Sequence, residues 1–394
     1  MTHQSGDVAR HLADVTGTRA QDWFPVFKAR YGMLEAFAAL AATGTERAVV
    51  TQFLTCATAV DPILVAGMTP TYAEVSPATL SLDPDALELG SDTAAVVIQH
   101  TFGIVDQSAA RRLAESARSV GALVCEDSAH CVGRMAIWPD GTPLADVSFH
   151  SFGAEKMLPT KFGGAVWVSP AMADRELRAA IVDRLLALKN PSPRLALAAR
   201  TYRYQLAVLN RLPRGLSRRL RALLTATSVL APPVAPAERE GRLAHAPVAA
   251  SDWVAHGMAS AMLTLPRVES GRARAVAAYV EELGDRVEVP AGITAGQPLV
   301  RFPFLAPPDV DADAVVARLR EQGVVAGDWY RPGLYPGAVD PEVYGYRPGD
   351  NAQPVTEDVI ARLVNLPTNV EPERARQIAR QALAVIDSCR VGRA

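Results

Sequence analysis

Apolar and polar positions in the first half of the chain follow two alternating patterns. Short, nearly continuous apolar runs at 94–100 and 122–127 are typical of strands that are buried on both faces, and further strands are predicted at 48–51 and 71–75. Apolar positions at helical spacing separate these runs, at 33–42, 58–65 and 106–120. Gly32 precedes the first of these helices, and Gly67 suits a helix C-cap after the second. The alternation predicts a parallel sheet covered on both faces by helices.

The pattern changes after Val168. Residues 172–230 read as consecutive helices, and the proline-rich run 232–236 reads as a stiff connector. A second α/β region follows, with a helix at 259–283, strands at 297–304 and 324–328, and helices at 356–364 and 371–388. We therefore expect three parts: a large sheet domain at 20–180, a helical insertion at 181–245 and a smaller α/β domain at 246–394.

Composition narrows the function classes. The chain has 394 residues, 49% of them hydrophobic, which is enough for a sizeable core. Its net charge of -2 argues against general nucleic-acid binding. The four cysteines show no CxxC pattern, and the first seven residues contain no apolar signal core. These features favour a reduced, cytoplasmic protein.

Two polar residues end predicted strands. His100 is the last residue of one predicted strand and Asp127 is the last residue of the next. In parallel sheets, functional groups lie at the carboxyl ends of the strands. Lys156 follows on a turn, in SFGAEK at 151–156. A strand-end carboxylate followed by such a lysine is what pyridoxal phosphate (PLP) requires. The lysine carries the cofactor as a Schiff base, and the carboxylate keeps the pyridine ring protonated.

The other groups that PLP needs are also present. Gly32 before a helix, with Ser151, offers N–H and hydroxyl donors for the phosphate. His130 can donate to the phenolic oxygen. Each residue alone also has a purely structural reading: a solvated lysine, a capping aspartate, a satisfied histidine, a turn-forming serine. The combination in this order is far more specific.

Several motifs together resemble the DegT/StrS family of PLP-dependent sugar aminotransferases. The resemblance covers residues 30–175 well and 250–390 loosely. The segments that carry it are GMTP at 67–70, VVIQHTFG at 96–103, EDSAHCVG at 126–133, DVSFHSFGAEK at 146–156 with GG at 163–164, GDWYRP at 327–332 and LVNLP at 363–367.

The resemblance implies the fold of the aspartate aminotransferases, PLP fold type I. Its large domain has three layers around a mostly parallel sheet, with a smaller C-terminal α/β domain. By position, Lys156 would form the Schiff base and shuttle a proton, Asp127 would pair with the pyridine nitrogen, and His130 would lie near the phenolic oxygen. Ser151 with the backbone at Gly32 and Met33 would bind phosphate. The family is dimeric, so a homodimer is expected.

Three positions depart from the family pattern. Cys56 stands where an aromatic side chain usually stacks on the pyridine ring; either a neighbour such as Phe53 stacks instead, or the ring packs on a smaller side chain. Residues 31–33 (YGM) replace the usual Ser/Asn-Gly-Thr. No counterpart of the Asn-Tyr-Arg segment, by which a dimer partner reaches the phosphate, is found around 252–256.

Residues 184–237 form a basic segment. It contains no acidic residue and ten basic ones: Arg184, Lys189, Arg194, Arg200, Arg203, Arg211, Arg214, Arg218, Arg219 and Arg221. Leucines interleave with them at roughly helical spacing. The arginines can pair with acidic surface elsewhere or in a dimer partner, face an anionic membrane surface, or recognise a phosphate-rich substrate or a carrier protein. A membrane contact would make the protein peripheral to the membrane.

The leading functional hypothesis is an aminotransferase that takes its amino group from an amino acid, such as L-glutamate, and passes it to a keto group of a sugar nucleotide or related metabolite. One alternative is another PLP reaction, elimination or dehydration, with Lys156 as the base. A second is a non-catalytic scaffold of the same fold that docks on membranes through 184–237.

Overall fold

The structure is a computed structural model that describes residues 3–44, 47–347 and 352–391. A seven-stranded sheet forms its centre, in the order β1-β7-β6-β5-β4-β2-β3. Strand β7 is antiparallel to both of its neighbours, and the remaining pairs are parallel. The strands are β1 (Trp23–Val26), β2 (Ala48–Thr51), β3 (Thr69–Tyr72), β4 (Thr93–Gln99), β5 (Leu123–Ser128), β6 (Val147–Ser151) and β7 (Gly164–Val168). The mostly parallel sheet predicted from the apolar runs is confirmed.

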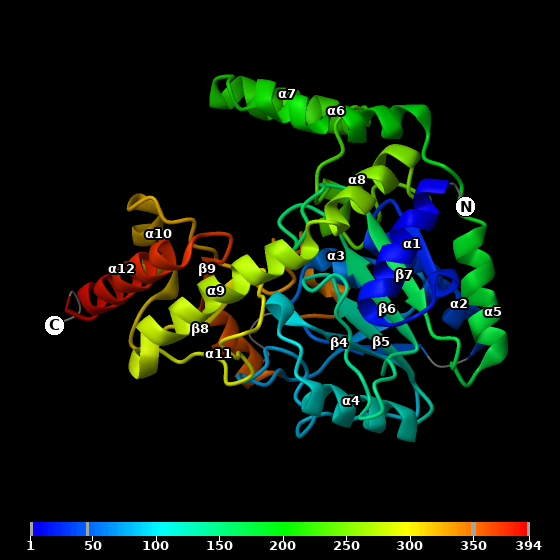
Figure 1. Ribbon diagram of the computed structural model, residues 1–394, viewed down its shortest axis with the longest axis horizontal. Helices are drawn as coiled ribbons and strands as arrows, with labels where there is room; N and C mark the ends of the chain where they lie inside the picture. The colour runs from blue at the N-terminus through cyan, green and yellow to red at the C-terminus, as the bar shows by residue number, and fades with distance from the viewer. Residues whose placement is uncertain (1–2, 45–46, 348–351, 392–394) are drawn as a thin grey trace.

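Helices cover both faces of this sheet (Figure 1). The covering helices are α1 (His3–Thr16), α2 (Ala29–Thr43), α3 (Ala57–Val65), α4 (Gln107–Ser119), α5 (Arg175–Leu186) and α8 (Asp252–Met262). Neighbouring residues of one strand enter different cores: Cys125 packs with the layer of α2 and α5, and Val124 packs with α4. Such alternation accounts for the nearly continuous apolar run of the central strand β4.

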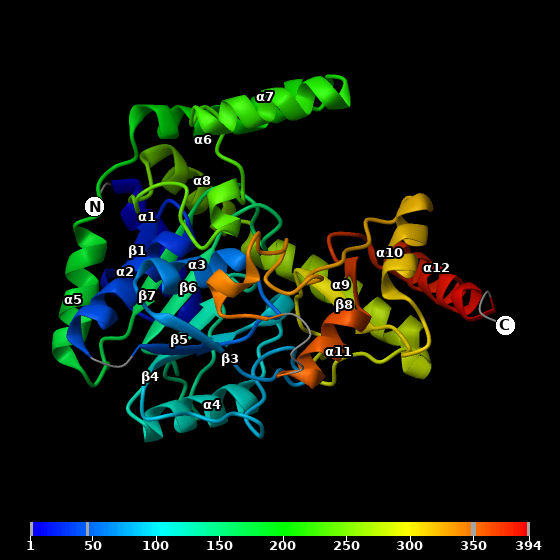
Figure 2. The same ribbon diagram turned by 180° about the vertical axis from the view of Figure 1, so that it is seen from behind.

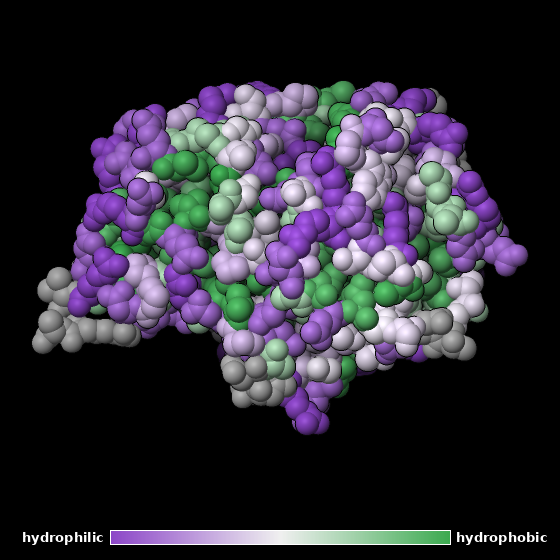
Figure 3. Space-filling view, turned by 90° about the horizontal axis from the view of Figure 1, so that it is seen from below, coloured by the Kyte–Doolittle hydropathy of each residue, from purple (hydrophilic) through white to green (hydrophobic). Residues whose placement is uncertain are grey.

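Helix α4 follows its sequence pattern closely. Asp106 caps it by accepting a hydrogen bond from the Ala109 N–H at 2.8 Å. The helix buries Leu113 and Ala114 against the sheet and exposes Arg112 and Glu115. Figure 3 shows the molecule from below the view of Figure 1, with hydrophobic areas lying among hydrophilic residues on this face.

Helix α2 begins earlier than predicted. The sequence placed Gly32 before a helix at 33–42, but the helix starts at Ala29 and Gly32 lies inside it. A Cβ atom at Gly32 would fall far inside van der Waals contact with Val166 Cγ2 on β7. This glycine therefore allows α2 to pack closely on the sheet, and the prediction that it marks the helix start is wrong.

The basic segment forms two consecutive helices, α6 (Pro193–Leu209) and α7 (Arg214–Ala226). Figures 1 and 2 both show this helical pair along one edge of the molecule, next to α8. Its inner side packs Leu206, Leu220 and Leu224 against the large-domain core. We call residues 193–226 the arm.

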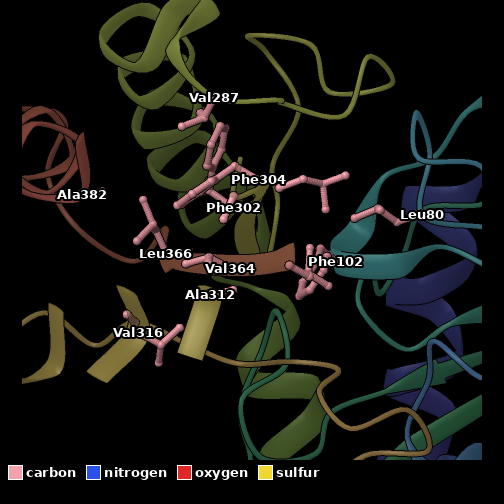
Figure 4. Packing of buried hydrophobic residues seen from close by; sticks show 14 of the residues in the cluster. Leu80, Phe102, Val287, Phe302, Phe304, Ala312, Val316, Val364, Leu366 and Ala382 are labelled. Atoms are coloured by element: carbon pink, nitrogen blue, oxygen red, sulfur yellow. The ribbon is translucent and has the colours of Figure 1, made fainter. Parts of the chain in front are cut away.

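The C-terminal part is smaller and contains a two-stranded antiparallel sheet, β8 (Arg301–Leu305) with β9 (Leu363–Pro367). Around it lie α9 (Leu265–Leu283), α10 (Ala312–Glu321), α11 (Pro354–Arg362) and α12 (Pro372–Val391). Phenylalanines of β8 fill the core between these helices (Figure 4). Residues 348–351 and 392–394 of the expected third domain lie outside the described residues.

Several predictions for this part need correction. The expected helix at 259–283 is two helices, α8 and α9, because Pro266 begins a new one. The expected strand at 297–304 starts only at Arg301, and 324–328 forms a single bridge from Gly327 to Asn365. The helix expected at 356–364 ends at Arg362, where β9 begins.

The expected domain boundaries stay a proposal. All seven strands of the central sheet fall within 20–180. However, α1 precedes residue 20, and α8, placed by the sequence in the third part, packs against α1. The Phe27 N–H also donates to the Val248 carbonyl at 3.2 Å.

Candidate active site

A cavity of about 470 Å³ opens at the carboxyl edge of the central sheet. Its wall is formed by strand ends, the first turns of α2 and α3, the arm, and the loop after residue 327. Six of the seven residues expected at the site line it: Met33, Cys56, Asp127, His130, Ser151 and Lys156. Gly32 is the exception, since it faces β7 and is absent from the lining.

Lys156 lies on a turn that is closed by hydrogen bonds. The Thr160 hydroxyl donates to the carbonyls of Phe152 at 3.0 Å and Phe162 at 2.6 Å, and Gly153 forms a bridge with Lys161. Burial lowers the pKa of the Lys156 amine, and the charge of Arg30 acts in the same direction, whereas Cys56 and Asp127 oppose the shift. The site therefore favours a neutral amine, which is the nucleophilic and basic form.

Asp127 is a buried carboxyl group at the end of β5. Its Oδ1 accepts a hydrogen bond from the Ala129 N–H at 2.9 Å. Burial raises its pKa, while that hydrogen bond and the positive charge of Lys156 lower it. A bound cation would favour the charged carboxylate further.

A polar network lies beside Asp127. Glu126 accepts hydrogen bonds from the Ser148 hydroxyl and the Ala136 N–H, both at 2.6 Å, and its Oε1 lies 2.7 Å from His100 Nε2. Burial alone would raise the pKa of Glu126, but these partners hold it below its usual value. This network fixes the end of β5, and sequence reasoning did not find it because glutamate before the aspartate gave no separate signal.

His130 is held by both ring nitrogens. Its Nδ1 accepts from the Phe102 N–H at 2.9 Å, so Nε2 carries the proton and donates to the Tyr330 hydroxyl at 3.0 Å. Burial lowers the pKa of His130 well below its usual value, which keeps the ring neutral. Its proton is engaged with Tyr330, so a role as donor to a cofactor oxygen stays a prediction.

Ser151 ends β6 and faces the cavity. Its Oγ accepts from the Gly153 N–H at 3.2 Å, which leaves its own hydroxyl proton available to donate. The other expected phosphate donor, Gly32, is replaced at the cavity wall by Lys28, Ala29 and Arg30 from the true start of α2.

Cys56 precedes α3 and lines the cavity, but Phe53 does not. The Phe53 ring stacks on Tyr346 with a centroid distance of 4.8 Å, inside the small-domain core. The alternative that Phe53 stacks on the cofactor ring is therefore contradicted.

Aromatic residues from distant parts of the chain complete the cavity. Trp329 and Tyr330 stack against His130, with centroid distances of 5.8 and 6.0 Å. Tyr335 also lines the wall, and Tyr202 and Leu206 of the arm close another side. The motif GDWYRP pointed weakly to Trp329 and Tyr330, whereas no sequence signal marked Tyr202 or Leu206.

This donor set fits PLP. A buried carboxylate suits the pyridine nitrogen, an amine of lowered pKa suits the aldehyde carbon, and hydroxyl, amide and cationic groups suit the phosphate. The fold and the site together define a PLP-dependent enzyme of fold type I.

Comparisons with known proteins agree with this class. Residues 31–194 match the model of the DegT/DnrJ/EryC1/StrS aminotransferase family. No curated protein matches the chain. The family's cofactor is PLP and its reaction is amino transfer.

Solved structures show the same fold at low sequence identity. DesI, solved in the presence of its TDP-sugar product, is 24% identical with a TM-score of 0.68, over 99% of this chain and 86% of its own. The aminotransferase TlmJ from Streptoalloteichus hindustanus is 22% identical with a TM-score of 0.69, over 98% and 92%. NtdA from Bacillus subtilis, solved with bound cofactor PMP, is 16% identical with a TM-score of 0.68, over 98% and 78%.

Proposed function

We propose that this aminotransferase moves the amino group of L-glutamate, or a similar amino acid, to a keto group of a sugar nucleotide or related metabolite. The observation that carries the proposal is that Lys156, Asp127, His130 and Ser151, spread over 30 residues of sequence, line one cavity. DesI, a structure of the same fold that was solved in the presence of its TDP-sugar product, supports an acceptor of this class.

Each side chain of the site has its own role in the proposed reaction. PLP, when bound, supplies an electron sink for the carbon that bears the amino group. Lys156 would attach the cofactor, and burial, which lowers the pKa of its Nζ, favours the form that can take a proton from that carbon and return it. Asp127 holds the protonated pyridine nitrogen, and the aromatic groups around His130 exclude water from the reacting atoms.

A spectroscopic screen tests this function. Purified protein with PLP should be yellow, and an effective amino donor should bleach it by converting the cofactor to its amine form. Lys156→Ala should remove the yellow band, whereas Lys161→Ala, at a second lysine that lines the cavity, should keep it. A wild-type protein that stays colourless with PLP contradicts the proposal, and a yellow protein that forms elimination products without bleaching points to the alternative reaction.

We also propose that the arm contacts an anionic membrane surface. Its outer side exposes Leu197, Tyr204, Val208, Leu216 and Leu223 between arginines. Of the ten basic residues of 184–237, only Arg184 forms an ion pair within the described part of the chain, with Glu35 at 2.8 Å. Unpaired arginines around an exposed apolar stripe favour binding to lipid head groups.

No helix in the described ranges is long and apolar enough to cross a membrane. The proposed contact is therefore peripheral. Because Tyr202 and Leu206 of the arm also line the cavity, the site would lie next to that surface and could receive a membrane-derived acceptor.

Sedimentation with liposomes tests the contact. Binding to vesicles of phosphatidylglycerol, but not of phosphatidylcholine, is expected at low salt and should weaken as salt rises. The double variant Arg218→Gln/Arg219→Gln should bind several-fold less, while Arg267→Gln/Arg274→Gln, at exposed positions of α9, should bind like wild type. Equal binding by both double variants, or none by wild type, would refute the contact.

The homodimer and the cytoplasmic location implied by the family resemblance and by the cysteines remain proposals. Sedimentation equilibrium of the purified chain would test the first, and fractionation of cells into soluble and membrane fractions would test the second.

A further inference from the structure

The first turn of α2 places two cations in the wall of the cavity. Lys28 is the residue before the helix and Arg30 belongs to its first turn, and both line the cavity with Ser151 and Lys156. The start of a helix offers unpaired backbone N–H groups and the positive end of its dipole. Cations beside it strengthen the attraction for an anion.

Both cations are held by Glu238, whose side chain is fully buried. Its Oε2 lies 2.7 Å from Arg30 Nη1, and its Oε1 lies 3.6 Å from Lys28 Nζ. The Ala235 N–H donates to Oε2 at 2.8 Å and so fixes the carboxylate. Glu238 thereby orients two side chains that enter the cavity from another element.

The segment that returns from the arm adds further contacts to the same cations. Lys28 Nζ donates to the Pro232 carbonyl at 3.4 Å, and Arg30 Nη2 donates to the Pro233 carbonyl at 3.0 Å. Because proline has no N–H, the backbone of Pro232 and Pro233 offers these cations only carbonyl acceptors. Residues 232–238 therefore hold the side chains of Lys28 and Arg30 in place at the cavity wall.

Charge in this cluster is not balanced. Two cations face one carboxylate, so a positive charge remains at a wall where Lys28 is only 8% exposed. Burial lowers the pKa of Lys28 to about 8 despite the nearby Glu238. The charge of Arg30 also lowers the pKa of Lys156, which places Arg30 within electrostatic reach of that amine. An anion bound between the cations would relieve their repulsion.

We propose that Lys28 and Arg30 hold the phosphate group of the cofactor and that Glu238 is the residue that positions them. The proposal rests on the proposed function. It replaces the sequence expectation for Gly32, which faces β7. It also accounts for the missing counterpart of the Asn-Tyr-Arg segment, because cations of the same chain take over that partner-borne role.

Comparison of two ligands tests the proposal. PLP and pyridoxal share the ring and the aldehyde, but pyridoxal lacks the phosphate. The full chain, stripped of cofactor, is titrated with each, and binding is followed by quenching of tryptophan fluorescence, since Trp329 lines the cavity. Arg30→Gln and Lys28→Gln should each weaken PLP binding by about 10- to 100-fold, the effect of losing a hydrogen bond to a charged group. Pyridoxal binding should change less than about threefold, because no phosphate contact is lost.

Glu238→Gln keeps the size of the side chain and its acceptor for Ala235 but removes the charge. Glu238→Gln should weaken PLP binding more than pyridoxal binding. Arg30→Lys should recover part of the PLP affinity that Arg30→Gln loses. Lys161→Gln is the matched control, because this cation lines the cavity from a different element. It should leave the ratio of the two dissociation constants unchanged.

The outcomes are distinguishable. Equal weakening of PLP and pyridoxal by Arg30→Gln and Lys28→Gln would show a merely structural role and overturn the proposal. If Lys161→Gln no longer binds PLP more tightly than pyridoxal, the phosphate lies near Lys161 instead, and the proposal is overturned too. Tighter PLP binding by Glu238→Gln would overturn the positioning role of Glu238. If the wild-type chain binds neither ligand, the proposed function itself fails.

Discussion

Asp61 is a buried carboxyl group in the middle of α3, away from the predicted chemistry. The Tyr344 hydroxyl donates to its Oδ1 at 2.7 Å, and its Oδ2 has no hydrogen-bond partner within the described ranges. Burial raises its pKa to about 8, although the Tyr344 hydrogen bond and Arg30 act in the opposite direction. At neutral pH the folded protein therefore holds a proton here that the unfolded chain releases.

The stability of the fold should depend on this proton. Because the folded-state pKa is raised, the folded state binds more protons than the unfolded state between about pH 4 and pH 8, and stability falls as pH rises through that window. Asp61→Asn removes the dependence. Its free energy of unfolding, relative to wild type, should rise by about 1.4 kcal/mol per pH unit between pH 5 and pH 8.

Urea denaturation at each pH measures this difference. Asp140→Asn is the control, since hydrogen bonds from Thr142 lower the pKa of the exposed Asp140 and both states are ionised throughout the range. Its difference from wild type should stay flat. A flat difference for Asp61→Asn as well would show that Asp61 is ionised in the folded protein.

Single residues of the site were predictable where their motif is local. Asp127 and His130 share one short run at a strand end that the apolar pattern identifies, and Ser151 and Lys156 share another run that the family resemblance marks. Glu238 gave no such signal. Its partners lie about 200 residues earlier in the chain, and a glutamate beside prolines reads as an exposed turn.

The sequence predicted the bounds of helices and strands well where the apolar pattern is long and has clear ends. Strand β4 and helix α4 were placed within one residue at most ends, because continuous burial and an aspartate cap define them. Strand β9 was missed because LVNLP continues the apolar rhythm of α11 without a break. The start of α2 was misplaced because its first turn carries polar residues that are buried in a charge cluster.

Gly32 shows how packing overrides helix propensity. Gly32→Ala should gain up to about 1 kcal/mol from propensity. Overpacking against Val166 costs about 1–3 kcal/mol, so a net loss of stability is expected. Gly271→Ala in α9, where no atom lies within 4 Å of the added Cβ, should instead be stabilising. Thermal melts of both variants give the comparison, and stabilisation by Gly32→Ala would contradict the close approach of α2 to β7.

At the scale of the whole molecule, Phe102 connects the part around the central sheet with the C-terminal part. It follows β4, and its ring lies in the small-domain core, as Figure 4 shows. Its N–H donates to His130 Nδ1 at 2.9 Å, and its carbonyl accepts from the Val300 N–H at 2.8 Å. Neither contact could be predicted from sequence, because both join segments far apart along the chain.

Replacing this ring should affect both the fold and the site. Phe102→Ala should lower the free energy of unfolding by about 3–5 kcal/mol, as expected for a fully buried phenylalanine. It should also weaken PLP binding several-fold, because His130 and Tyr330 lose a ring that packs against them at 6.1 and 5.9 Å between centroids.

Phe304→Ala separates the two effects. Phe304 is equally buried in the same core but belongs to β8 and has no ring contact with His130 among the described residues. It should lose similar stability while PLP binding, measured well below the melting temperature of both variants, stays close to that of wild type. If both variants weaken PLP binding to the same extent, the small domain acts on the site only through overall stability. If Phe102→Ala alone does so, the link from the small-domain core to the cofactor site runs through this one side chain.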